Sequence, residues 1–200
     1  MPYLTQFKEM RIEKIINQPV TSNCFIIFHE KDESCIVIDP GSEDVSVIES
    51  FIENKKVDFI FLTHEHYDHI WGADKLRQKY NAKLCCSLEA SNAITNKKRN
   101  LSVFYNQVGF ELNAADIIIE GENVIDWHSV PVEIIHTPGH TEGSICIKIF
   151  NNLFTGDTII KEIRTVTKRQ GGNKEKLQNS IEKLKKMGLN SLNLYCGHKK

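Results

Sequence analysis

Residues 63–69 read Thr-His-Glu-His-Tyr-Asp-His, and this stretch decides the fold of the 200-residue chain. It directly follows the apolar run VDFIFL, which is typical of a buried strand. Alternate side chains of an extended segment point the same way, so His64, His66 and Asp68 should converge. His69 should then open the next helix. Because imidazole nitrogens and carboxylate oxygens are ligands of zinc, iron and manganese, the stretch predicts a metal site at a strand end.

Three further residues of ligand type each follow a glycine at the end of an apolar run: His140, Asp157 and His198. Glycine lets the backbone turn sharply and approach a site closely. Taken singly, a Gly-Asp-Thr turn or a Pro-Gly-His loop is ordinary. Together with residues 63–69 they bring the number of ligand-type residues at four strand ends to seven. The pattern predicts that these four ends meet around metal.

Strand-like and helix-like segments alternate along the chain. Apolar residues at helical spacing predict helices at Glu43–Asn54, Asp68–Tyr80, Leu88–Ile94 and Lys174–Met187. Short apolar runs predict strands at Asn23–Phe28, Ser34–Ile38, Val57–Leu62, Lys83–Cys86, Ile117–Ile119, Val132–His136, Ser144–Phe150, Leu153–Thr155 and Leu192–Cys196, the first two forming a hairpin. Because no repeat or linker interrupts this order, we expect residues 1–200 to form one domain in which two sheets lie between helices.

Composition narrows the class of protein. The 25 basic and 26 acidic residues give a net charge of −1, which argues against a nucleic-acid partner. The chain has no apolar run approaching 18 residues and no apolar segment near its start, so we expect neither a membrane span nor a secretory signal. The six cysteines form no Cys-x-x-Cys pair and lie mostly in apolar runs. We therefore expect buried, reduced thiols in a cytoplasmic protein.

Five motifs of the chain resemble, in the same order, those of the metallo-β-lactamase-fold hydrolases. They are Asp39-Pro40-Gly41, residues 63–69, TPGHTEGS at 137–144, TGDT at 155–158 and Gly197-His198. The resemblance extends from Asn23 to His198. It implies an α/β fold, a four-layer αβ/βα sandwich with metal ions at one edge between the two sheets.

The same resemblance implies a set of ligands for two divalent metal ions, zinc in the first place and iron or manganese as alternatives. One ion would be held by His64, His66 and His140, the other by Asp68, His69 and His198, with Asp157 bridging both. Asp39 would orient a metal-binding histidine from behind. Glu65 either faces solvent or supports a ligand from behind. His29, His128 and His136 match no ligand position and are interpreted as surface or strand residues.

Two such ions can share a hydroxide that attacks a carbonyl, with Asp68 as the catalytic group that orients the nucleophile or carries a proton. The nearest resemblance is to small, single-domain glyoxalase II-like (hydroxyacylglutathione hydrolase-like) thioesterases, through Asn23-Cys24-Phe25, the Ile-Asp-Pro-Gly turn and Asn100-Leu101-Ser102. Classical glyoxalase II carries a further C-terminal helical domain, which we do not expect here because the chain stops two residues after His198. Lactone or other small-ester hydrolysis, a mononuclear iron persulfide dioxygenase of the same fold and a noncatalytic metal-binding role remain alternatives.

The segment after Asp157 departs from the family pattern. Val166-Thr167-Lys168 stands where such thioesterases carry Arg-Thr-Asp, and the segment has four cations, at Lys161, Arg164, Lys168 and Arg169. These cations either lie in solvent or form a rim that attracts an anionic substrate. Arg164 and Lys168 are the candidate rim residues. The rim hypothesis predicts a small anionic thioester or ester as substrate and poor hydrolysis of lactoylglutathione.

Overall fold

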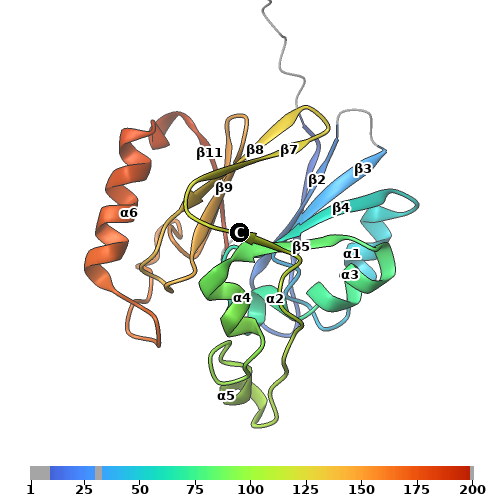
Figure 1. Ribbon diagram of the computed structural model, residues 1–200, viewed down its shortest axis with the longest axis horizontal. Coiled ribbons are helices and arrows are strands. Elements are labelled where there is room, and N and C mark those ends of the chain that lie inside the picture. Colours follow the sequence, from blue (N-terminus) through green and yellow to red (C-terminus); the bar gives the residue numbers. More distant parts are fainter. Residues whose placement is uncertain (1–9, 30–32, 199–200) are drawn as a thin grey trace, which may run out of the picture.

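The computed structural model describes residues 10–29 and 33–198, which fold into two β-sheets covered by helices on their outer faces (Figure 1). The first sheet has six strands in the order β1 to β6: Ile12–Ile16, Asn23–Phe28, Ser34–Ile38, Lys56–Phe61, Lys83–Ser87 and Ile117–Ile119. β1, β2 and β3 pair antiparallel, and β3 to β6 are parallel. Parallel strands need crossover connections, which here carry α1 (Ser46–Ile52), α2 (Tyr67–Ile70), α3 (Ala73–Tyr80), α4 (Leu88–Ile94) and α5 (Ser102–Asn106).

The second sheet has five strands in the order β11-β10-β9-β8-β7. β7 (Asn123–Trp127), β8 (Val130–His136), β9 (Ile145–Ile149) and β10 (Asn152–Gly156) form an antiparallel meander. α6 (Lys174–Lys186) and a 3-10 turn (Leu189–Ser191) then lead to β11 (Asn193–Cys196), which pairs parallel to β10. No helix within the described ranges combines the length and apolar character that crossing a bilayer requires.

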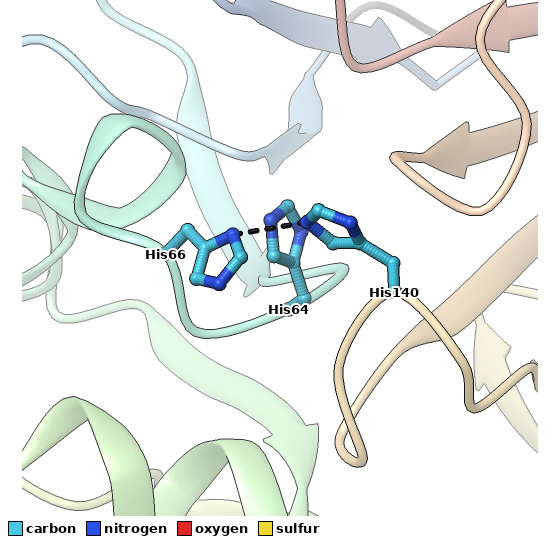
Figure 2. A group of neighbouring side chains, drawn as sticks. All are labelled: His64, His66 and His140. Carbon is cyan, nitrogen blue, oxygen red and sulfur yellow. Dashed lines mark hydrogen bonds between the residues drawn. The ribbon is translucent and has the colours of Figure 1, made fainter. Parts of the chain in front are cut away.

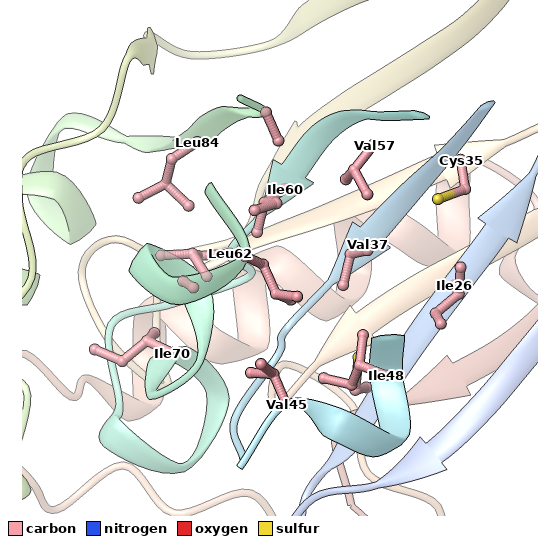
Figure 3. Packing of buried hydrophobic residues seen from close by; sticks show 14 of the residues in the cluster. Ile26, Cys35, Val37, Val45, Ile48, Val57, Ile60, Leu62, Ile70 and Leu84 are labelled. Carbon is pink, nitrogen blue, oxygen red and sulfur yellow. The ribbon is translucent and has the colours of Figure 1, made fainter. Parts of the chain in front are cut away.

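Alternating side chains of the strands build the layers. In β2, Ile26 faces a cluster with Ile48 of α1 and Leu76 of α3, whereas Ile27 faces the second sheet and packs with Ile147. Figure 3 shows the outer cluster, in which the strands direct Ile26, Cys35, Val37, Val57 and Ile60 toward the helices. A third cluster joins the second sheet to Leu184 of α6. The four layers confirm the predicted αβ/βα sandwich in one domain (Figure 1).

The hairpin of Asn23–Phe28 and Ser34–Ile38 is confirmed residue for residue. The single helix predicted over Asp68–Tyr80 is wrong, because the segment forms α2 and α3 with a break at Gly72. The Gly72 amide donates to the Pro40 carbonyl at 2.8 Å, and a Cβ there would lie 2.5 Å from Val45 Cγ1. The turn of the chain that follows β3 therefore interrupts the helix.

Besides the 3-10 turn, three elements lie outside the predicted ones: β1, β7 and α5. β1 and β7 stand at sheet edges, and their mixed polar and apolar composition gave no strand signal. All six cysteines are buried and unpaired, as expected of reduced thiols. Two backbone bonds hold the sheets together at one end: the Thr63 carbonyl accepts from the Ile145 amide at 2.8 Å, and the Gly197 carbonyl accepts from the Asn23 amide at 2.7 Å.

Candidate metal centre

Residues from five loops converge at this end of the two sheets. Asp39 follows β3, and residues 64–69 follow β4. His140 lies between β8 and β9, Asp157 follows β10 and His198 follows β11. The ends of parallel strands meet at one edge, and the antiparallel meander returns its own loops to the same place. The structure thus brings together all seven ligand-type residues predicted from the sequence.

His64, His66 and His140 form one group, in which a ligand atom from each lies within 4.8 Å of the others. Figure 2 shows the three rings turned toward one another, two from the loop after β4 and one from the loop after β8. His66 Nδ1 and His140 Nε2 are 3.0 Å apart. The Nδ1–H of His140 donates to the Val166 carbonyl at 2.8 Å, which leaves Nε2 of the neutral ring with a free lone pair directed into the site.

A chain of hydrogen bonds sets the tautomer of His64. The Thr63 hydroxyl donates to Asp39 Oδ2 at 2.6 Å, so its oxygen accepts from His64 Nδ1 at 3.1 Å. His64 Nε2 therefore carries no proton, and it is buried without a hydrogen-bond partner. An orphaned, buried ring nitrogen that faces two other imidazoles costs free energy unless a cation occupies the space between them.

A second group consists of Asp68, His69 and His198. Asp39 Oδ2 accepts from His69 Nδ1 at 2.9 Å, and the Thr21 carbonyl accepts from His198 Nδ1 at 2.8 Å. The two Nε2 atoms then face each other at 3.3 Å. Bare nitrogens at that distance repel unless a proton or a metal ion lies between them. Asp39 thus sits behind His69 and fixes its orientation, which is the contact expected of it from the sequence.

Asp157 lies between the two groups. Its Oδ2 is 3.5 Å from His140 Nε2 and 3.4 Å from His198 Nε2, and its Oδ1 is 3.6 Å from His69 Nε2. Oδ1 is buried and has no hydrogen-bond partner. The carboxylate therefore faces the Nε2 atoms of both groups, the position that a bridging ligand requires.

Two glycines allow this approach. Gly156 has φ +47, and a Cβ there would lie 2.2 Å from Thr63 Oγ1. A Cβ on Gly197 would lie 2.4 Å from Asp157 Oδ1 and 2.8 Å from His69 Cε1. Side chains at either position would push the loops apart. The Gly-Asp and Gly-His pairs seen in the sequence therefore serve close packing of the loops around the site.

The electrostatics favour a bound cation. Burial lowers the pKa of His64, and the neighbouring histidines lower it further, so this ring stays neutral. Burial would also lower the pKa of His69, but Asp68, Asp39 and Asp157 outweigh it and raise that pKa to about 10. Burial would raise the pKa of Asp157, yet hydrogen bonding to His198 and the charges of the nearby histidines hold it far below its usual range. With its pKa raised to about 10 the His69 ring holds a proton that a divalent cation would replace, and imidazole nitrogens with ionised carboxylates are then a donor set that fits zinc, iron or manganese.

Glu65 and the three remaining histidines of the chain belong to neither group of candidate ligands described above. Glu65 is buried rather than solvent-facing, and its carboxylate accepts from the Thr141 hydroxyl at 2.8 Å. His29 is buried against Trp127, His128 is exposed beside Asp58, and His136 lies in β8. None of these three histidines belongs to a group of potential ligand atoms in the described part of the chain.

A cavity of about 820 Å³ opens over the site and is lined by His66, Asp68, His140, Asp157 and His198. Arg164 and Arg169 also line it, whereas Lys168 is exposed and does not. Of the two candidate rim residues, Arg164 lines the cavity and Lys168 does not, and Arg169 lines it instead. The sequence does not encode the direction of a side chain in an irregular loop. Besides the candidate metal ligands, Arg164 and Arg169 are thus the charged residues that line the space where a substrate would sit.

Curated relatives share the chain over most of its length. A Bacillus subtilis protein named probable metallo-hydrolase YqgX is 30% identical over 171 residues, covering 83% of this chain and 80% of that protein. The probable polyketide biosynthesis zinc-dependent hydrolase PksB, also of Bacillus subtilis, is 27% identical over 179 residues, covering 89% and 73%. A hydroxyacylglutathione hydrolase of Pelagibacter ubique is 31% identical over 179 residues, covering 86% of this chain and 64% of that protein.

Solved structures agree on the fold. The crystal structure of the BLEG-1 B3 metallo-beta-lactamase superposes with a TM-score of 0.85 at 22% identity, covering 95% of this chain and 92% of that one. The sequence-family model described as metallo-beta-lactamase superfamily matches residues 17–198 of this chain. This range begins before β2 and ends on His198, the last of the converging histidines. On these grounds the chain belongs to the metallo-beta-lactamase superfamily.

Proposed function

We propose that the chain is a dinuclear metal-dependent hydrolase that cleaves thioesters. The observation that carries the proposal is the position of Asp157, whose oxygens lie 3.4–3.6 Å from ring nitrogens of His140, His69 and His198 while Oδ1 has no hydrogen-bond partner. One ion would be held by His64, His66 and His140 and the second by Asp68, His69 and His198, with Asp157 shared. Zinc is proposed first because the relative PksB is named as a zinc-dependent hydrolase.

Two divalent ions in such a site supply a nucleophilic hydroxide at neutral pH and stabilise the charge that develops on a carbonyl oxygen. In thioester hydrolysis the oxygen of water bonds to the carbonyl carbon, the carbon–sulfur bond breaks, and a proton passes to the departing thiolate. Asp68 lines the cavity with a side chain that is 13% exposed, so it can orient the water or carry that proton. The Asp39 carboxylate holds His69 in the orientation that keeps its Nε2 directed at the site.

The choice of a thioester rests on the relative that is named hydroxyacylglutathione hydrolase. A lactone or another small ester would be attacked at the same carbonyl carbon, and it is the second candidate substrate. The family comparison favours hydrolysis in both cases, because the relatives are named as hydrolases.

The test combines metal content with a substrate panel. Protein purified without chelator and analysed for elements should contain close to two equivalents of zinc, iron and manganese combined. It should hydrolyse thioesters under anaerobic conditions, and lactoylglutathione, aliphatic thioesters and lactones should be compared by kcat/KM. A content of one equivalent or less after reconstitution would overturn the dinuclear centre. Oxygen consumption with a persulfide substrate and no anaerobic turnover would overturn hydrolysis.

A further inference from the structure

The cavity over the metal centre has an apolar part and a cationic part. Leu101, Phe104 and Tyr105 contribute apolar surface from the region of α5. Ile163 and Val166 add more from the loop after β10, and the same loop supplies Arg164 and Arg169. Metal binding accounts for neither part, because none of these seven residues belongs to any of the three groups of potential ligand atoms among the described residues.

The apolar part is rigidly joined to the metal centre. Tyr105 stacks on Tyr67, with ring centroids 5.2 Å apart, and Tyr67 directly follows His66. The Tyr67 amide donates to the Asn100 carbonyl at 2.9 Å, and the buried Asn100 side chain donates to the Phe110 carbonyl at 2.9 Å. These bonds hold residues 100–110 against the loop that carries His66. The apolar surface is thus preformed beside the site.

Part of this surface is open to solvent. The Phe104 side chain is 73% exposed, Val166 is 50% exposed and Ile163 is 44% exposed. Exposed apolar groups that rim a cavity mark a place where a ligand removes them from water. A carbon chain bound there would cover Phe104 while its carbonyl reaches the metal centre.

The cationic part is available for a ligand. Within residues 10–29 and 33–198, the guanidinium groups of Arg164 and Arg169 form neither an ion pair nor a side-chain hydrogen bond, although both line the cavity. The acids that share the cavity, Asp68 and Asp157, face the ring nitrogens of the metal centre. A planar guanidinium with unused donors matches a carboxylate or a phosphate.

We propose that the substrate carries an apolar acyl group, which packs on Leu101, Phe104 and Tyr105, and an anionic leaving group, which Arg164 and Arg169 bind. The inference rests on the proposed hydrolysis and extends it by assigning the two ends of the substrate. The cavity of about 820 Å³ is large enough for such a substrate. Cavities of about 300–1,000 Å³ are typical of small-molecule sites. Carboxylate and phosphate share the chemistry that the two arginines recognise, and the experiment distinguishes them.

The experiment is a two-way panel of thioesters assayed with the metal-loaded protein. Acetyl, butyryl and hexanoyl groups are joined to three thiols: neutral N-acetylcysteamine, 3-mercaptopropionate and 2-mercaptoethyl phosphate. We expect kcat/KM to rise about tenfold or more from acetyl to hexanoyl, since each methylene buried on the apolar surface adds to binding. The kcat/KM of thioesters of the two anionic thiols should exceed that of thioesters of the neutral thiol by about 10- to 100-fold. The anionic thiol with the higher kcat/KM shows whether the arginines prefer a carboxylate or a phosphate.

Matched variants locate the two effects. Phe104→Ser should flatten the dependence on acyl length, whereas Val108→Ser should not, because Val108 is 70% exposed on the same segment but does not line the cavity. Arg164→Ala and Arg169→Ala should each reduce the preference for the anionic thiols. Lys168→Ala, on the same loop and outside the cavity lining, should retain it.

Binding of the non-hydrolysable hexyl thioether of each thiol, measured by calorimetry, separates this inference from the proposed function. If no thioester is hydrolysed but the thioethers show the same dependence on Phe104, Arg164 and Arg169, hydrolysis fails and the assignment of the cavity holds. If thioesters are hydrolysed with no preference for acyl length or charge, the assignment is overturned and hydrolysis holds. Equal effects of Lys168→Ala and Arg169→Ala would also overturn it.

Discussion

The Thr141 hydroxyl donates a 2.8 Å hydrogen bond to the Glu65 carboxylate, and both side chains are buried. Glu65 stands between His64 and His66, and Thr141 directly follows His140. The bond therefore joins the two loops that carry the first group of candidate ligands. Thr141 is also within 3.0 Å of Ser144 Oγ, so the contact is part of a small buried polar network.

Thr141→Val should weaken the link between these two loops. Valine has nearly the volume of threonine but no hydroxyl, so the buried Glu65 carboxylate loses this hydrogen bond. We expect metal affinity to fall about 10- to 100-fold, the usual effect of losing a group that supports ligands from behind. Competition with a chelator measures it. Thr141→Ser keeps the hydroxyl and should bind metal like the wild type. Equal affinity of all three proteins would mean that the bond does not position the histidines.

Asp157→Asn should impair both halves of the metal centre, since the charged carboxylate becomes a neutral amide of the same volume and one of its two oxygens becomes an NH2 group, which cannot act as a ligand. Elemental analysis should show a loss at both positions, accompanied by loss of turnover. His128→Ala is the control, because His128 is exposed and contacts Asp58 near the start of β4, whereas the candidate ligands follow the end of that strand. Loss of metal from the His128 variant to the same extent would refute the assignment of Asp157.

Gly197→Ala tests the close approach of the last strand end. A Cβ at this position would lie 2.4 Å from Asp157 Oδ1, so Asp157 and His69 must move apart. We expect reduced metal content in a protein whose circular dichroism stays native. Gly121→Ala provides the comparison, because a Cβ at Gly121 meets nothing within 4 Å and the position is far along the chain from any candidate ligand. Its φ of +63 should cost about 1 kcal/mol of stability without a change in metal content.

Asp58 makes stability depend on pH. Burial by itself would raise the pKa of Asp58, but hydrogen bonds from Lys56, Trp127 and His128 outweigh it and hold that pKa well below its usual range. A lowered pKa in the folded state stabilises the protein above the unfolded value of about 4, and this contribution fades as pH falls further. Asp58→Asn should therefore destabilise the fold by about 1–3 kcal/mol at pH 7.

The difference between wild type and Asp58→Asn should shrink below about pH 4, where the wild-type carboxyl begins to lose its advantage. Urea unfolding at pH 7, 5 and 3 measures it. Asp126→Asn is the control, since Asp126 lies in β7 beside Trp127, which contacts Asp58, and its carboxylate accepts a hydrogen bond from the Ser129 amide at 3.3 Å. A constant difference across the three pH values would show that the stabilisation does not depend on the charge of Asp58.

Much of the candidate site could be predicted from the chain because its signals are local. His64 and His66 directly follow a buried strand, and a glycine directly precedes both Asp157 and His198, so each signal lies within a few residues of the chain. The extended geometry that predicted convergence of Asp68 with His64 and His66 does not hold, because Asp68 lies in α2 and groups with His69 and His198. Apolar runs likewise predicted the hairpin of Asn23–Phe28 and Ser34–Ile38 with its observed bounds. Edge strands such as β1 and β7 were missed, since half of their surface faces water and their composition resembles that of loops.

Only the tertiary structure decided which way a side chain in an irregular segment faces. Arg169 and Lys168 are neighbours in the chain, yet only Arg169 lines the cavity. The sequence left Glu65 either facing solvent or supporting a ligand from behind, whereas the structure buries it against Thr141, which lies far along the chain. The helix break at Gly72 depends on a contact with Pro40 and Val45. The sequence by itself predicted seven ligand-type residues at four strand ends and two sheets between helices, because local patterns encode them. The division of the ligands between two ions and the four-layer order were implied by the resemblance to the metallo-β-lactamase-fold hydrolases. Contacts between distant segments determined the rest, since packing against a remote neighbour leaves no periodic pattern in either segment.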